Sequence, residues 1–250
     1  MLTPLIQALE AVGTYVLLLR RTFTGLLNWR LYWQLWTQEF IIIGRDSIFL
    51  VAIIAFFVGA VTTVQTAYQL VSPFIPKSTI GAIVSTSSIL ELAPTITSLV
   101  LAGRVGSNIA SQIGSMRVSE QIDALEVMGI NSATYLILPK LIAGLIAFPI
   151  LVIYSCGISH IGGIAAGAFT GAVNPTQFGI GARSFFETFQ IIFMLIKAVT
   201  FGFIIVTVSS YQGYYVRGGA LEVGAASTKA VVISSLMILI ADYVLAQLLL

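Results

Sequence analysis

Charge, cysteine and histidine are scarce in this chain, and each shortage excludes a class of protein. Only 9% of the 250 residues are charged, against about a quarter in soluble domains. The single Cys156 excludes an intrachain disulfide, and with one histidine, His160, the chain offers no cluster of metal ligands. With 58% hydrophobic residues and a mean hydropathy of +1.00, the composition places the protein in a lipid bilayer.

Motifs for nucleotide binding and covalent chemistry are also missing. The nearest approach to G-x-x-x-x-G-K-[ST] is Gly219 to Ala226, where Ala225 and Ala226 replace the lysine and the Ser/Thr. Neither G-x-S-x-G nor H-E-x-x-H occurs in the sequence. We therefore expect no enzymatic activity, no metal or cofactor in this chain, and no nucleic-acid partner.

Long apolar runs dominate the remaining sequence, and we read five membrane spans from them. A run of about 20 apolar residues crosses the hydrocarbon core, and Pro149 and several glycines favour one long, bent or tilted helix for the third run. The predicted spans lie between Asp46 and Lys77, then at Ile80 to Ala102, Leu141 to Val173, Thr188 to Tyr211 and Val231 to Leu250. The prediction is an all-α membrane protein with one domain, residues 1–250.

Basic residues predict the orientation of these spans, because Lys and Arg accumulate in cytoplasmic loops. A cytoplasmic N-terminus places nine of them inside and only Lys77 and Arg183 outside. The nine are Arg20, Arg21, Arg30, Arg45, Arg104, Arg117, Lys140, Arg217 and Lys229. Five spans then place the C-terminus outside.

Residues 1–45 form an arm before the five-span body of residues 46–250. The segment "NWRLYWQLW", Asn28 to Trp36, mixes Trp and Tyr with Arg, a composition typical of the headgroup layer. We expect an interfacial helix there, with a plain cytoplasmic extension as the alternative. The opening residues lack the basic region of a secretory signal peptide, and no Arg- and Ser-rich transit leader is present.

The segment "MRVSEQIDALEVMGI", Met116 to Ile130, is unusually acidic for this chain. Ser119 is a candidate N-cap and Gly129 a stop, which predicts a short helix over residues 119–128 in the cytoplasm, between spans two and three. Helical spacing places Ile122, Leu125 and Met128 on one side and Glu120, Asp123 and Glu126 on the other. Surface helices that rest on lipid usually present Lys and Arg, so this acidic face favours a protein partner over a lipid-resting loop helix.

Three blocks of sequence are similar to the MlaE-type permeases, the membrane subunits of lipid-transporting ABC systems. They are "ELAPTITSLVLAGRVGSNIASQIGSMRVSEQIDALEVMGINSATYLILPKLIAG" (Glu91 to Gly144), "LIKAVTFG" (Leu195 to Gly202) and "STKAVVISSLMILIADYVL" (Ser227 to Leu245). The resemblance covers most of the chain after about residue 40. Ala93 stands where the family usually has glycine.

The resemblance implies a five-span subunit with an N-terminal interfacial helix that works as a homodimer. It implies two copies of a cytoplasmic ABC ATPase, which bind ATP and Mg, an MCE-domain protein outside and often a STAS-domain protein on the ATPase. The implied cargo is phospholipid or related lipid moved between the inner membrane and an outer compartment. The implied coupling helix contains Glu120, Gln121, Asp123, Leu125 and Glu126. The implied location is the bacterial inner membrane, with the plastid inner envelope as the second choice.

Charged residues within the spans are candidates for the substrate path. Glu91 lies about 20 Å from either end of the second span, and a lone carboxylate in hydrocarbon costs at least ~2.5–3.5 kcal/mol. Lys197 has a comparable depth in the fourth span, so the two either pair structurally or line a cavity for a zwitterionic headgroup. Pro94 leaves the Leu90 carbonyl without its usual partner, which favours a bend beside Glu91. Asp242, nearer the chain end, we assign a structural role.

Two further patterns leave alternatives open. Gly163, Gly167 and Gly171 repeat G-x-x-x-G, which suits either a dimer seam or close packing inside the subunit. A proton-coupled secondary transporter that uses Glu91 and Asp242, or a structural membrane subunit, are the alternative functions. The first usually shows inverted repeats and more spans, and the second leaves the acidic cytoplasmic helix unexplained.

Overall fold

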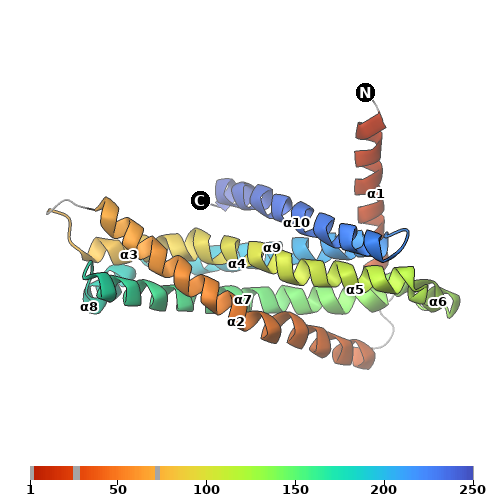
Figure 1. The fold of residues 1–250 in the computed structure, drawn as a ribbon, viewed down its shortest axis with the longest axis horizontal. Coiled ribbons are helices and arrows are strands. Elements are labelled where there is room, and N and C mark those ends of the chain that lie inside the picture. The colour runs from red at the N-terminus through yellow and green to blue at the C-terminus, as the bar shows by residue number, and fades with distance from the viewer. Residues whose placement is uncertain (1–2, 25–28, 71–73, 250) are drawn as a thin grey trace. The chain divides into compact units, whose positions relative to one another are not determined.

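The computed structural model describes residues 3–24, 29–70 and 74–249, and these residues form helices without a strand (Figure 1). The helices are α1 (Thr3–Phe23), α2 (Trp29–Gln69), α3 (Ser78–Ser87), η1 (Ser88–Ile96), α4 (Thr97–Leu101), η2 (Ala102–Gly106), α5 (Ser107–Val118), α6 (Gln121–Val127), α7 (Ser132–Thr170), α8 (Pro175–Ser184), α9 (Thr188–Tyr214) and α10 (Ala220–Leu249). Asn28 and Leu250, which bound two of the predicted segments, and residues 71–73 of the first apolar run lie outside the described residues.

Within the described part of the chain, five stretches of helix are long and apolar enough to cross a membrane, which confirms the predicted count. They are Trp33–Gln69, Ser78–Val118, Ser132–Thr170, Thr188–Tyr214 and Ala220–Leu249. The N-terminal helix α1 precedes them, as expected. The aromatic segment forms no helix of its own, however, because α2 runs without a break from Trp29 into the first span. Gly44 is the only Gly or Pro between this segment and the apolar run, and a single glycine inside a helix does not end it.

The second span changes its helical geometry twice. The π-helix η1 contains Pro94, and η2 contains Arg104. Proline lacks an N–H, and its ring clashes with the carbonyl four residues earlier, here that of Leu90. A π-helix has wider hydrogen-bonded turns, and such turns are frequent at functional sites. The disturbance predicted beside Pro94 is therefore present as a π-helical segment.

The chain forms two compact units, each described by itself below. Unit 1 comprises Met1–Ile43, Ala102–Leu145 and Phe203–Met237, and unit 2 comprises Gly44–Leu101, Ile146–Gly202 and Ile238–Leu250. In unit 1, the Tyr15 hydroxyl donates to Thr207 Oγ1 at 2.8 Å, and Thr14 Oγ1 lies 2.9 Å from the Tyr211 hydroxyl. Burial raises the pKa of the Tyr15 phenol above its usual value, so this donor stays protonated. These contacts hold α1 against α9.

Close backbone approaches organise unit 2. A Cβ on Gly162 of α7 would lie 2.1 Å from the Phe56 carbonyl oxygen of α2, and one on Gly59 would lie 1.9 Å from that of Ser159. A Cβ on Gly163 would lie 2.7 Å from Thr63 Oγ1, also on α2. Small residues let membrane helices approach closely. Gly163 therefore belongs to a seam inside the chain, the second of the two readings of the glycine repeat.

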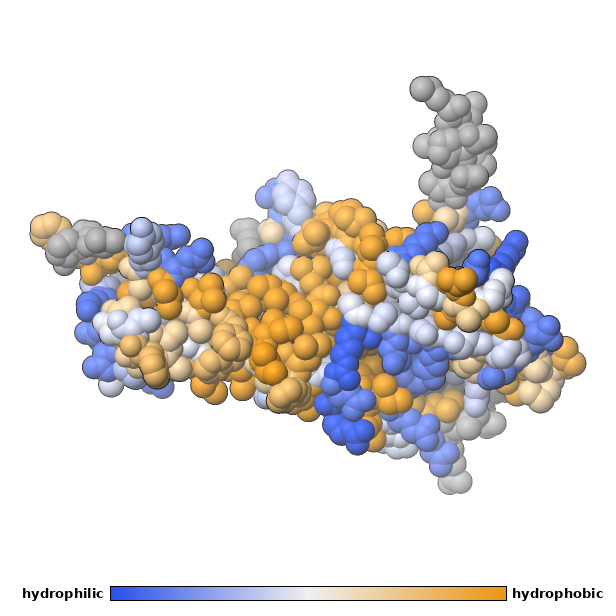
Figure 2. All heavy atoms as spheres, in the orientation of Figure 1, coloured by the Kyte–Doolittle hydropathy of each residue, from blue (hydrophilic) through white to orange (hydrophobic). Residues whose placement is uncertain are grey.

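Apolar side chains cover much of the face seen in Figure 2. Phe49 and Phe57 of α2 and Leu236 and Ile240 of α10 are among the large exposed ones. Soluble monomers rarely expose contiguous apolar surface of this kind, whereas lipid or a partner helix covers it in a membrane. The exposure agrees with the span count.

Candidate functional site

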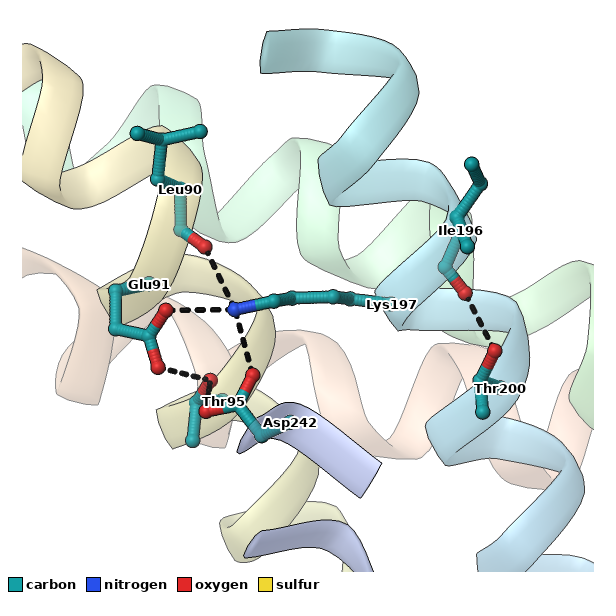
Figure 3. Close-up of polar contacts among 7 residues, drawn as sticks. All are labelled: Leu90, Glu91, Thr95, Ile196, Lys197, Thr200 and Asp242. Carbon is teal, nitrogen blue, oxygen red and sulfur yellow. Dashed lines mark hydrogen bonds and ion pairs between the residues drawn. The ribbon is translucent and has the colours of Figure 1, made fainter. Parts of the chain in front are cut away.

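A lysine ammonium lies between two carboxylates within the candidate spans (Figure 3). Lys197 Nζ of α9 is 2.6 Å from Glu91 Oε2 of η1 and 2.6 Å from Asp242 Oδ1 of α10. It also donates to the Leu90 carbonyl oxygen at 3.1 Å. Three helices of unit 2 thus converge on one cation.

Burial of Lys197 is complete, since its side chain is 0% exposed. A buried ammonium requires paired charge and hydrogen-bond acceptors, and this one has two carboxylates and a carbonyl. Nζ also lies 4.7 Å from the ring centroid of Phe193, one turn earlier on α9. The Leu90 carbonyl is the one that Pro94 deprives of its α-helical partner, so the π-helix supplies an acceptor that an ordinary helix would have used internally.

The two carboxylates differ in exposure. The Asp242 side chain is 11% exposed, while that of Glu91 is 51% exposed. Thr95 Oγ1 lies 3.3 Å from Asp242 Oδ2 and 3.5 Å from Glu91 Oε1, so its hydroxyl bridges the pair. With both carboxylates ionised the cluster carries a net charge of −1. An exposed carboxylate within a span is stable only against water, protein or a polar ligand.

The structure brings together Glu91 and Lys197, the two residues that the sequence singles out. It adds Asp242, for which a partner was not anticipated. The only signal for Asp242 in the sequence was its charge within the fifth apolar run. Helix packing across 45 residues of chain, from Lys197 to Asp242, lies beyond what spacing within one helix reveals. Pro94 itself is buried in η1 and acts through the carbonyl it frees.

An open apolar hollow of about 500 Å³ also belongs to unit 2. It is lined by Ala60, Val61, Val64, Gln65 and Tyr68 of α2. Ligand pockets commonly have volumes of about 300–1,000 Å³ and mostly apolar walls. The hollow is wide open and its lining is mostly apolar, so it forms an apolar surface along α2.

His160 is hydrogen-bonded within unit 2. Its Nε2 lies 2.9 Å from Ser85 Oγ, and its Nδ1 lies 2.8 Å from the Cys156 carbonyl oxygen. Both ring nitrogens therefore have partners, as in a packed core histidine. Within residues 3–24, 29–70 and 74–249, no group of three His, Cys, Asp or Glu side chains is placed to hold a metal ion.

The short helix α6 occupies the position predicted for the acidic segment, but its start differs. The N-cap is Glu120, at a left-handed φ of 59°, and the helix begins at Gln121. The expectation that Ser119 caps the helix is wrong, because its hydroxyl donates back to the Ser115 carbonyl at 2.8 Å. A serine at the end of α5 has this acceptor one turn behind it, and the local bond competes with capping. Gly129, with φ 76°, follows the helix as predicted.

The acidic face of α6 is partly engaged by the chain itself. Asp123 Oδ1 pairs with Arg117 at 2.6 Å, and Glu126 Oε1 accepts hydrogen bonds from Ser132 and Tyr214. For Glu120, no side-chain partner occurs among the residues that the structure describes. Of the three carboxylates on this helix, two therefore already have partners within the chain.

The residues predicted for the apolar side of α6 differ in exposure. Ile122 is buried and Leu125 half-buried, as the amphipathic pattern predicts. Met128 is 64% exposed, contrary to the pattern, because Gly129 ends the helix before that turn is covered. Val127 is 89% exposed beside it. The C-terminal end of α6 thus exposes apolar side chains, while Glu120 and Gln121 begin the helix at its other end. Exposed apolar side chains of this kind suit a surface for a protein partner.

Five candidate spans, an N-terminal helix and a charged cluster within the spans define a multi-pass, all-α membrane protein. It belongs to the MlaE permease family, because the family model described as Permease MlaE matches residues 36–248. This confirms the resemblance carried by the three sequence blocks.

Relatives span bacteria and a plant. The chain is 38% identical over 243 residues to a "Probable ABC transporter permease protein" of Rickettsia bellii, covering 97% of this chain and 93% of the relative. It is 33% identical over 224 residues to the chloroplastic protein TRIGALACTOSYLDIACYLGLYCEROL 1 of Arabidopsis thaliana, covering 89% of this chain and 63% of the relative. It is 28% identical over 241 residues to the "Intermembrane phospholipid transport system permease protein MlaE" of Haemophilus influenzae, covering 96% of this chain and 92% of the relative.

Proposed function

We propose that this chain is the permease subunit of an ABC transporter that moves phospholipid or a related lipid between the inner membrane and an outer compartment. A separate cytoplasmic ATPase drives it, and the chain itself performs no covalent chemistry. The names of the relatives support the permease role, and that of the Haemophilus protein supports phospholipid as the cargo. The observation that carries the proposal is the cluster of Glu91, Lys197 and Asp242 within the spans.

The cluster suits a zwitterionic headgroup through Glu91. Lys197 is fully buried and satisfied, so the group open to a ligand is the half-exposed Glu91 carboxylate. A carboxylate with excess negative charge behind it attracts the cationic end of a headgroup, and low dielectric strengthens that attraction. The apolar hollow on α2 supplies surface for acyl chains.

We propose the assembly that the resemblance implies. A homodimer with two ATPase subunits, an MCE-domain protein outside and in some systems a STAS-domain protein forms the transporter. The bacterial inner membrane is the proposed location. A chloroplastic relative keeps the plastid inner envelope as the second candidate.

Glu91→Gln is expected to keep the protein folded and to lower the lipid that co-purifies with it. Asp242 still neutralises Lys197 in the variant, so no buried ammonium is stranded. The headgroup loses a charge-assisted contact of about 1.5–3 kcal/mol, which corresponds to a loss of about tenfold or more in affinity. Lipid per subunit and thermal stability are measured after purification with the neighbouring gene products.

Two results of that purification would contradict the proposal. The absence of any co-eluting ATPase from the wild-type preparation would favour the secondary transporter or the structural subunit. Wild-type lipid content and ATP-driven lipid transfer in a stable Glu91→Gln variant would remove Glu91 from the lipid path.

Charge on α6 is expected to contribute to ATPase docking. Reversal of Glu120, Asp123 and Glu126 together to Lys should lower ATPase binding, but it also breaks the contacts of Asp123 and Glu126 within the chain. Glu120→Lys alone tests docking more cleanly, and like charge opposite a basic socket should lower retained ATPase about fivefold, or ~1 kcal/mol. Glu10→Lys on the exposed part of α1 makes the same charge change elsewhere. Equal ATPase retention in both variants would exclude a charge-dependent dock.

A further inference from the structure

Three oxygen atoms meet where α6 joins the rest of unit 1. Glu126 Oε1 accepts from Ser132 Oγ at 2.9 Å and from the Tyr214 hydroxyl at 3.1 Å. Ser132 Oγ and the Tyr214 hydroxyl are 2.7 Å apart. Glu126 belongs to α6, Ser132 is the first residue of α7, and Tyr214 is the last residue of α9. One carboxylate oxygen therefore links three helices.

This cluster is more than a surface contact, because its two hydroxyls are buried. Tyr214 is 5% exposed and Ser132 is 1% exposed. A buried hydroxyl without a partner costs free energy, so Tyr214 holds Glu126 in one place. Hydrogen bonds to a charged acceptor are about twice as strong as neutral ones. The three contacts share two hydroxyl hydrogens, so the loss of either hydroxyl leaves the other free to donate to Glu126.

The loop after α6 and the first turn of α7 are both attached to α1. Asn131 Nδ2 and Thr134 Oγ1 each donate to the Arg21 carbonyl oxygen at 3.0 Å. α1 is itself held on α9 through Tyr15 and Thr207. Side-chain bonds from α6 to α9, from the loop to α1, and from α1 to α9 thus close a ring within unit 1. A short helix with only Ile122 fully buried is in this way tied to two longer helices.

We infer that Tyr214 is a positioning residue that transmits displacement of α6 to α9, the helix that also carries Lys197. The inference rests on the proposed function, in which an ATPase docks on α6 and moves it. Packed side chains and hydrogen-bond networks carry coupling between sites, and the Tyr214 hydroxyl provides the side-chain hydrogen bond from α9 to α6 that the structure describes. The Ser132 hydroxyl instead connects α6 to the start of α7. The two hydroxyls also contact each other, so the two routes are distinguished by removing one hydroxyl at a time.

Tyr214→Phe tests the inference, because it removes one oxygen atom and leaves the ring in place. The transporter is reconstituted in phospholipid vesicles with its ATPase, and lipid transferred per ATP hydrolysed is measured on complexes isolated by size exclusion. We expect ATPase binding and basal hydrolysis to stay near wild type, since Tyr214 is itself buried and Ser132 still holds Glu126 in the variant. Lipid per ATP should fall about fivefold or more, the lower end of typical coupling between sites.

Two control variants show whether a fall in lipid per ATP is due to the Tyr214 hydroxyl. Tyr215→Phe removes the neighbouring hydroxyl, for which no hydrogen bond occurs among the described residues, and should keep the wild-type ratio. Ser132→Ala cuts the link from α6 to α7 but leaves Tyr214 bonded to Glu126, and should also stay near the wild-type ratio. Only assembled complexes are assayed, so a variant that assembles in lower yield does not lower the measured lipid transferred per ATP.

The outcomes separate this inference from the proposed function. A wild-type ratio in Tyr214→Phe would overturn the inference alone. An equal fall in Ser132→Ala would show general loosening of α6 and would also overturn it. Failure of the wild-type chain to bind any ATPase would overturn the proposed function, and the inference with it.

Discussion

Replacement of Lys197 by methionine is expected to destabilise the protein by about 3–5 kcal/mol, the cost of breaking a buried ion pair by removing one partner. The change leaves Glu91 and Asp242 facing each other without a cation, and Asp242 is nearly buried. The Leu90 carbonyl, whose α-helical donor Pro94 removes, also loses its hydrogen bond from Lys197. Thermal unfolding of the purified protein in detergent measures the effect.

Neutral replacement of the whole cluster provides the control. Glu91→Gln, Lys197→Met and Asp242→Asn together remove all three charges, and stability should recover most of the loss, because isosteric neutral replacements of buried ion clusters are often tolerated. Lys229→Met makes the same chemical change at an exposed position of α10 and should have little effect. A stable Lys197→Met protein would mean that the carboxylates bind another cation or a proton, and that the cluster does not depend on Lys197.

Much of this architecture can be predicted from sequence because bilayer length and hydropathy constrain it. Runs of about 20 apolar residues predict all five spans, and a lone carboxylate such as Glu91 in such a run requires a partner. Lys197 was the natural partner by depth. The contribution of Asp242 could not be derived, because the rotation of α10 about its axis depends on packing and not on its own sequence.

Rules for helix capping and amphipathic pattern predicted less well where other hydrogen bonds compete for the same side chains. Ser119 has the identity of a cap but bonds to the preceding turn. Glu126 lies on the polar side of α6 as predicted, yet Ser132 and Tyr214 engage it within the chain. Tyr214 is 88 residues away from Glu126 in sequence. An amphipathic pattern identifies which side of a helix is polar, but it does not say whether solvent, a partner or the same chain covers that side.

Gly162→Ala is expected to destabilise unit 2 by about 1–3 kcal/mol or more, the range of overpacked cores. The new Cβ would lie 2.1 Å from the Phe56 carbonyl oxygen, so α2 and α7 would have to separate along their seam. Gly157→Ala on the same helix is the control, since its Cβ would meet nothing within 4 Å. Alanine is favoured over glycine in a helix by about 1 kcal/mol, so the control should be neutral or stabilising. Thermal unfolding of the two proteins gives the comparison.

Gly59→Ala approaches the same seam from α2, where its Cβ would lie 1.9 Å from the Ser159 carbonyl oxygen. Because either substitution already separates the helices, the double variant should lose less than the sum of the two single losses. If these glycines instead formed the dimer seam, Gly162→Ala would leave the unfolding temperature of the isolated subunit unchanged and dissociate the dimer. Unfolding curves and the oligomeric state, measured on the same samples, therefore decide whether Gly162 and Gly59 join α2 to α7 or one subunit to another.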